Sequence, residues 1–123
     1  MHVNCTGLSP RELASIASGA EEHTASPGEV LTREGDEGDE FFVIASGSVV
    51  ITSVGRELAR LGPGDYLGEI ALVLGGSRTA TATVEEPALL FVLGKDSFTA
   101  MLQEQPGIED KILTTVSARM RYR

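Results

Sequence analysis

A short stretch near the middle of the chain carries the side chains best suited to bind a ligand. Glu69 and Arg78 lie nine positions apart in the segment Gly-Glu-Ile-Ala-Leu-Val-Leu-Gly-Gly-Ser-Arg, which begins at Gly68. The planar guanidinium of an arginine matches a phosphate, and a carboxylate accepts hydrogen bonds from hydroxyl groups. Together they suit a ligand with sugar hydroxyls and a phosphate. A plainer alternative is a solvated arginine beside a Gly-Ser turn and a glutamate that balances a helix dipole.

The local pattern predicts how these two side chains are positioned. Glycines on both sides limit 69–74 to one or two helical turns, so Glu69 falls in the first turn. Alternating threonine and alanine predict a strand over 79–84, which puts Arg78 at a loop-to-strand junction. Amides in the first turn of a helix have no partner inside the helix and attract anions. The pattern therefore indicates a compact anion site.

The order of these residues resembles the phosphate-binding cassette of cyclic nucleotide-binding domains. Such domains occur in catabolite-activator-type regulators, cyclic-nucleotide-dependent kinases and cyclic-nucleotide-gated channels. The resemblance runs from about Leu8 to the last helix, and one departure is Ser77, where many members carry proline. The other matching fragments are Pro27–Leu31, Arg33–Ile44, Ser46–Val49 and Leu61–Glu69.

The resemblance implies a role for each cassette residue. Glu69 would accept a hydrogen bond from the ribose 2′-hydroxyl, and Arg78 would pair with the cyclic phosphate. Backbone amides on either side would complete the phosphate cradle. The implied ligand-binding residues are Gly68, Glu69, Ile70, Ala71, Arg78, Thr79 and Ala80.

The resemblance also implies the ligand, which is cAMP or cGMP. A hydroxyl at the position of Thr79 occurs in relatives of either preference, and we expect cAMP rather than cGMP. In relatives the base is capped by a residue far along the terminal helix, where Arg119, Tyr122 and Arg123 are the candidates here. Ligand binding is expected to shift the packing of the C-terminal helices, with Pro106-Gly107 as the hinge.

Composition predicts one domain, spanning residues 1–123, with a largely aliphatic core. The chain is 41% hydrophobic but only 5% aromatic, and 14 glycines indicate many tight turns. A net charge of −8 argues against nucleic acid as a partner. Cys5 is the single cysteine, so a cytoplasmic setting is expected, and no apolar stretch is long enough for a membrane span.

The order of predicted elements gives the fold class. A capping box, Ser9-Pro10-Arg11-Glu12, predicts a first helix that ends at Gly19. Strands follow over 20–26, 29–33, 41–45, 49–54, 57–61, 79–84 and 88–93. A helix with Asp96 as its N-cap and a last helix over 108–122 complete the chain. This order predicts a mainly β fold, an antiparallel jelly-roll-like β-roll with an N-terminal helix, a short cassette helix and C-terminal helices.

Other functions find little support in the residues. The two histidines, His2 and His23, lie in no catalytic motif, and the paired histidines of a cupin-type metal enzyme are missing, so we expect no enzyme. The acidic run 34–40 lacks the spacing of a helix–loop–helix calcium site, and no metal is expected. The remaining alternative is a β-roll interaction module that binds no nucleotide. In either case the effector would be elsewhere, because no DNA-binding, kinase or pore sequence is present.

Overall fold

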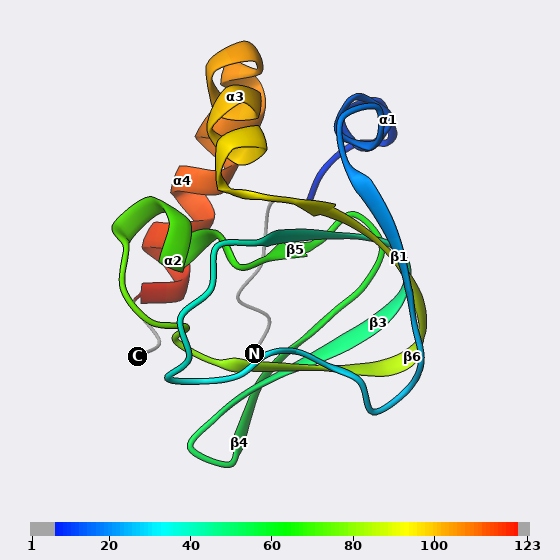
Figure 1. Cartoon of the computed structure of the whole chain (residues 1–123), viewed down its shortest axis with the longest axis vertical. Helices are drawn as coiled ribbons and strands as arrows, with labels where there is room; N and C mark the ends of the chain where they lie inside the picture. The colour runs from blue at the N-terminus through cyan, green and yellow to red at the C-terminus, as the bar shows by residue number, and fades with distance from the viewer. Residues whose placement is uncertain (1–6, 121–123) are drawn as a thin grey trace.

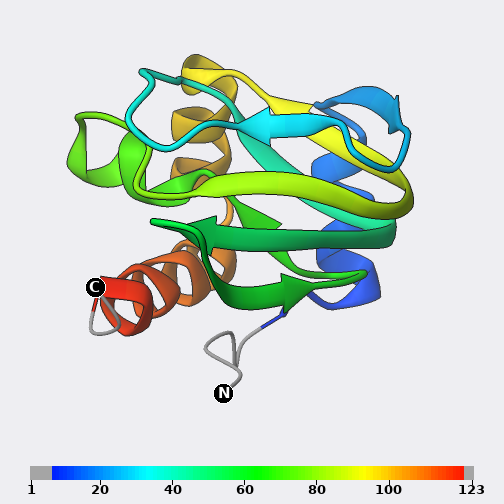
Figure 2. The same cartoon turned by 90° about the horizontal axis from the view of Figure 1, so that it is seen from below.

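Two long antiparallel strands form the centre of the fold. The computed structural model describes residues 7–120. In it, β3 (Phe41–Ser53) and β6 (Thr81–Leu93) pair along nearly their whole length, from Phe41 opposite Leu93 to Thr52 opposite Thr81. Both strands curl, so the sheet wraps around its own apolar face (Figures 1 and 2).

Shorter strands extend this central pair on both sides. β1 (Glu21–Ala25) and β2 (Val30–Thr32) pair with β6, while β4 (Arg56–Leu61) and β5 (Tyr66–Leu67) pair with β3. Every pairing is antiparallel. The predicted antiparallel β-roll with flanking helices is confirmed.

Helices lie along one side of the roll. α1 (Pro10–Ala17) precedes the strands, α2 (Glu69–Leu74) interrupts them, and α3 (Lys95–Glu104) and α4 (Pro106–Met120) follow. Figure 1 shows α2 beside the C-terminal part of α4, with α3 above them and α1 at the upper right, above the sheet. The end of α4 therefore reaches the short helix on which the predicted site depends.

The first residues of the helices show which of the predicted capping residues are present. The capping box of α1 is present, since the Glu12 amide donates to Ser9 Oγ at 3.2 Å and the Ser9 amide donates to Glu12 Oε1 at 2.9 Å. The prediction of Asp96 as an N-cap is wrong, because Gly94 is the N-cap of α3. α4 begins at Pro106, which suits a first helical position since its missing amide would have no partner there.

Two apolar clusters, one on each face of the sheet, explain the continuous hydrophobic runs of the sequence. Phe41 and Val43 point to the helices, whereas Phe42 and Ile44 point into the roll. Side chains alternate along a strand, so a strand buried on both faces needs apolar residues at every position. The helix-side cluster also includes residues of all four helices α1 to α4, which are Ile16, Ile70, Phe98, Met101, Ile108, Ile112 and Val116.

The predicted breaks in the long strands are wrong. Ser46-Gly47-Ser48 and Glu85-Glu86-Pro87 were expected to separate strands, but β3 and β6 run through them. The two segments face each other, with Ser48 opposite Glu86 and irregular register around it. Gly47 has a φ of +89°, and a Cβ there would lie 2.3 Å from the Pro87 carbonyl oxygen. The breakers therefore mark a shared bend in two paired strands rather than strand ends.

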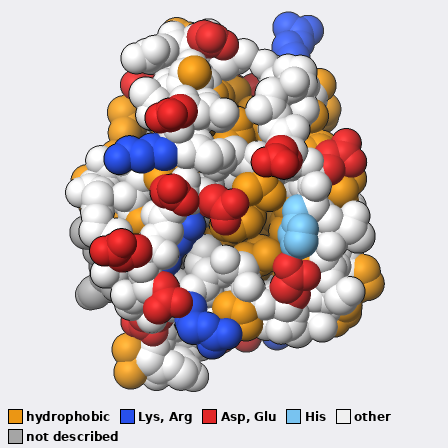
Figure 3. Space-filling view, viewed as in Figure 1, with side chains coloured by type: hydrophobic (Ala, Val, Ile, Leu, Met, Phe, Trp, Pro, Cys, Tyr) orange, Lys and Arg blue, Asp and Glu red, His pale blue; other side chains and the backbone are white. Residues whose placement is uncertain are grey.

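The surface carries the excess of acidic side chains. On the face shown in Figure 3, carboxylates are scattered around the molecule and are not gathered in one patch. Among residues 7–120 no group of three or more His, Cys, Asp or Glu side chains is arranged to hold a metal ion. None of the helices in this part of the chain is long and apolar enough to cross a membrane.

Candidate functional site

The turn before α2 is shaped by a glycine that no other residue can replace without strain. Gly68 is the N-cap of α2 with φ of +93°, in the left-handed region. A Cβ at this position would lie 2.6 Å from the Glu40 carbonyl oxygen and 2.9 Å from Arg78 Nη1. Gly68 thus brings the backbone of two loops and the arginine side chain together at the start of the helix.

Glu69 follows in the first turn of α2 and is completely buried. Its Oε2 lies 2.6 Å from Nη1 of Arg119, which comes from the last turn of α4. Its other oxygen, Oε1, is buried and has no hydrogen-bond partner. A buried carboxylate is stable only with a compensating charge and hydrogen-bond donors. One oxygen of Glu69 is satisfied by Arg119, and the other can still accept a hydrogen bond.

Arg78 is buried as well, at 7% exposure, and has a different environment. Its Nη2 donates to the Glu40 carbonyl at 2.9 Å and its Nη1 to the Gly68 carbonyl at 3.3 Å. It forms no ion pair with any carboxylate within residues 7–120. Burial lowers the pKa of this guanidinium, opposed by the more distant charges of Glu40, Asp39 and Glu69. A buried cation whose acceptors are all neutral is suited to bind an anion.

The Arg78 side chain runs through a narrow slot. A Cβ on Gly38 would lie 2.2 Å from Arg78 Nε, so the guanidinium lies directly against the backbone of that glycine. The backbone of Arg78 is also fixed, because its amide donates to the Asp36 carbonyl at 2.7 Å and its carbonyl accepts from the Gly35 amide at 3.0 Å. The loop before β3 therefore fixes the direction of the guanidinium.

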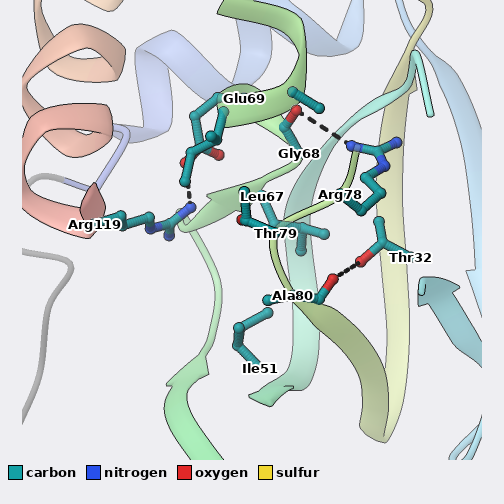
Figure 4. A pocket seen from close by; sticks show the side chains of 11 residues that line it. Thr32, Ile51, Leu67, Gly68, Glu69, Arg78, Thr79, Ala80 and Arg119 are labelled. Atoms are coloured by element: carbon teal, nitrogen blue, oxygen red, sulfur yellow. Dashed lines mark hydrogen bonds and ion pairs between the residues drawn. The ribbon is translucent and has the colours of Figure 1, made fainter. Parts of the chain in front are cut away.

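Both charged side chains border one small cavity of about 60 Å³, shown in Figure 4. All seven residues implied by the sequence line this cavity, namely Gly68, Glu69, Ile70, Ala71, Arg78, Thr79 and Ala80. The structure thus brings together residues from α2 and from the loop before β6.

Four further residues line the cavity. Thr32, Ile51 and Leu67 come from β2, β3 and β5 and were not proposed from the sequence, because nothing in their local pattern distinguishes them from other strand residues. Thr32 is polar but buried, and its hydroxyl donates to the Ala80 carbonyl at 3.1 Å. Arg119, expected only as a cap over a base, also lines the cavity and contacts Glu69. The other cap candidates, Tyr122 and Arg123, lie outside the described residues.

Tyr66 connects the cavity wall to α4. Its ring lies under the Arg119 guanidinium, with 5.7 Å between Cζ and the ring centroid, and its carbonyl accepts from Arg119 Nη2 at 2.9 Å. Its hydroxyl donates to the Lys111 carbonyl at 3.0 Å and contacts Thr115 Oγ1. Burial raises the pKa of Tyr66 to about 12. Tyr66, two residues before Gly68, is therefore in contact with α4 at three residues, which are Lys111, Thr115 and Arg119.

Comparison with known proteins agrees with this geometry. The family model described as cyclic nucleotide-binding domain matches residues 22–105. The chain is 30% identical over 120 residues to the Cyclic AMP receptor protein of Thermus thermophilus, covering 94% of this chain and 56% of that protein. It is 33% identical over 119 residues to the Acetyltransferase Pat of Mycolicibacterium smegmatis, covering 94% and 35%. The chain thus spans only about a third to just over half of the length of these two relatives.

Solved structures give the same result. The crystal structure of the Thermus thermophilus catabolite activator protein superposes with a TM-score of 0.79 at 30% identity, covering 94% of this chain and 57% of that one. The N-terminal domain of a transcriptional regulator from Streptomyces coelicolor superposes with a TM-score of 0.66 at 32% identity, covering 94% and 83%. On the match of the family model and on these relatives, the chain belongs to the cyclic nucleotide-binding domain family.

Proposed function

We propose that this chain is a sensor that binds a cyclic nucleotide in the cavity between Glu69 and Arg78. The observation that carries the proposal is the pair of incompletely satisfied buried charges on one cavity. Arg78 has only neutral acceptors, and Oε1 of Glu69 has no donor. A cyclic phosphate would supply the anion for Arg78, and a ribose 2′-hydroxyl would supply the donor for Glu69.

Backbone amides complete the proposed site. Ile70 and Ala71 lie in the first turn of α2, where amides have no acceptor inside the helix. Thr79 and Ala80, from the loop before β6, line the same cavity. In the proposed complex these four amides surround the phosphate, while Arg78 neutralises it and Glu69 fixes the sugar.

The preferred nucleotide is proposed to be cAMP. Its support is the similarity to the Cyclic AMP receptor protein of Thermus thermophilus, since Thr79 suits either base. The effector is proposed to be another domain or protein, because the similar Acetyltransferase Pat and receptor protein are both longer than the matched region. A cytoplasmic setting and the absence of catalysis remain predictions from the sequence.

Titration calorimetry with cAMP, cGMP and non-cyclic 5′-AMP tests the proposal. We expect cAMP to bind most tightly, and 100-fold excess over its Kd to stabilise the fold by about 2.7 kcal/mol. Absence of heat and of thermal stabilisation at millimolar cAMP and cGMP would favour the interaction module that binds no nucleotide.

Replacing the proposed phosphate ligand gives the first mutational prediction. Arg78→Ala should weaken cAMP binding by roughly 2–5 kcal/mol, because it removes a charge partner from a partly buried phosphate. Arg56→Ala is the matched control, because it removes the same positive charge from an exposed position on β4. Titration calorimetry measures the Kd for cAMP of both variants. Equal affinities for wild type and Arg78→Ala would show that the site is assigned wrongly.

A further inference from the structure

Arg119 holds the ribose end of the proposed site in a closed arrangement. Its side chain, 13% exposed, donates to Glu69 Oε2 at 2.6 Å and to the Tyr66 carbonyl at 2.9 Å. It also lies over the Tyr66 ring, with 5.7 Å between Cζ and the centroid. The Arg119 guanidinium makes all three contacts, and it therefore links the last turn of α4 to the start of α2.

The closed arrangement leaves too little room for a nucleotide. The cavity encloses about 60 Å³, whereas ligand pockets usually enclose about 300–1,000 Å³. Thr32, Ile51 and Leu67 belong to strands whose backbones are paired in the sheet. Arg119 is instead a long side chain near the end of a helix. Of these walls, Arg119 can move with the least disturbance of the backbone.

Glu69 is also the group that Arg119 and a ligand would share. In the structure Arg119 is the only described side chain that donates to this buried carboxylate. Because Oε1 of Glu69 has no partner in the structure, Arg119 and the ligand would not need the same oxygen. We infer that Arg119 competes with the ribose hydroxyl for the orientation of the Glu69 carboxylate, so that it limits ligand affinity and is released when ligand binds. The inference rests on the proposed nucleotide site and adds to it a residue that sets affinity. Release of Arg119 would free the last turn of α4 from α2.

Removing the competitor should tighten binding. When the closed state dominates, the apparent Kd exceeds the intrinsic Kd by the inverse of the open fraction. We expect Arg119→Gln to lower the Kd for cAMP about 3- to 30-fold in titration calorimetry. Arg56→Gln, which removes the same charge from an exposed position on β4, should leave the Kd for cAMP unchanged. An unchanged or weaker affinity of Arg119→Gln for cAMP would overturn the inference.

A ligand that lacks the shared hydroxyl separates competition from simple widening of the cavity. For 2′-deoxy-cAMP, which has no 2′-hydroxyl to offer Glu69, the gain from Arg119→Gln should be at least about threefold smaller than for cAMP. An equal gain for both nucleotides would exclude competition for Glu69. A variant that merely destabilises the fold would lower the melting temperature without tightening either ligand.

A second variant keeps the test open if Arg119→Gln does not fold. Glu69→Gln removes the charge that holds Arg119, so amide exchange over residues 116–120 should become faster in the absence of ligand. It should reach the rate that wild type shows with saturating cAMP. Unchanged protection in Glu69→Gln would overturn the inference. If the wild-type protein binds neither cAMP nor cGMP, the proposed function is wrong. The exchange measurement without ligand still shows whether the ion pair between Glu69 and Arg119 stabilises the last turn of α4.

Discussion

At the scale of single residues, Tyr66 is where the sheet, the cassette and α4 meet. Its side chain is fully buried, and its hydroxyl reaches the Lys111 carbonyl and Thr115 on α4. Its ring packs against Phe41, with 5.7 Å between centroids, and against the Arg119 guanidinium. A buried phenol can be ionised only at high pH, because burial disfavours the charged form.

Tyr66 therefore gives a prediction about pH. Burial raises its pKa from 10.0 to about 12, so the folded chain holds this proton where an unfolded chain has released it. The stability that Tyr66 contributes is complete below pH 10 and is lost as the pH rises towards 12. Tyr66→Phe should be less stable than wild type by about 1 kcal/mol at neutral pH, from the lost hydrogen bonds.

Urea unfolding of both proteins at a series of pH values measures this difference. The gap between wild type and Tyr66→Phe should narrow between pH 10 and pH 12, the range set by the unperturbed and raised pKa values. A constant gap over that range would mean that the hydroxyl is accessible to water in the folded chain.

At the residue scale, the sequence predicts best where the information is local. Glu69 and Arg78 line one cavity, as expected from the glycines that fix a short helix and a turn around them, whereas their role as ligand-binding residues stays a prediction. The contact between Glu69 and Arg119 was not predicted, since 50 positions separate them and only the packing of α4 brings them together. Likewise, nothing near Thr32 or Ile51 indicates that strands of the sheet place them on the cavity.

At the scale of elements, the loop before β3 controls the direction of Arg78. The slot beside Gly38 has no room for a methyl group, because a Cβ would lie 2.2 Å from Arg78 Nε. Gly38 does not have a positive φ, so alanine is compatible with its backbone and acts only by pushing the arginine. Such a substitution tests the position of the guanidinium without removing it.

We expect Gly38→Ala to weaken cAMP binding by about tenfold, or about 1.4 kcal/mol, because the displaced guanidinium would no longer face the phosphate. Calorimetry gives the affinity, and thermal unfolding should show the loss of stability of about 1–3 kcal/mol that overpacking usually causes. Gly62→Ala is the control, because no atom lies within 4 Å of the Cβ it would add. Wild-type affinity in Gly38→Ala would mean that Arg78 binds its ligand from another position.

Element boundaries were less predictable than element types. Apolar runs and capping signals predict the identities of strands and helices, but the turn residues of Ser46-Gly47-Ser48 and Glu85-Glu86-Pro87 predict strand ends where β3 and β6 continue. A turn signal read in one segment cannot reveal that a second such segment lies opposite it. The two bends are compatible with continuous strands only because β3 and β6 bend at the same place.

At the scale of the whole molecule, overall charge and local site have opposite effects on an anionic ligand. The chain carries a net charge of −8, and its carboxylates are spread over the face in Figure 3. Arg78 and Arg119 lie inside, where salt screens them little. The long-range field therefore repels a cyclic nucleotide, while the contacts inside the cavity attract it.

Salt should consequently speed up association. Raising the ionic strength from about 10 mM to about 150 mM shortens the Debye length from about 30 Å to about 8 Å and screens the repulsion. We expect the association rate of cAMP to rise about twofold, with little change in its dissociation rate. Stopped-flow measurements with a fluorescent cAMP analogue provide both rates. An association rate that falls with added salt would indicate that a local positive field guides the ligand.

The part of α4 that fills the helix-side cluster determines which fragments of this protein are worth expressing. The match to the family model ends at residue 105, just before α4 begins, and starts after α1. Trimming to those limits would remove Ile16, Ile112 and Val116, and expose the apolar surface they cover to aggregation. Screening fragments should therefore include at least residues 8–119, so that Leu8 of the same cluster, the capping box and Arg119 are all retained.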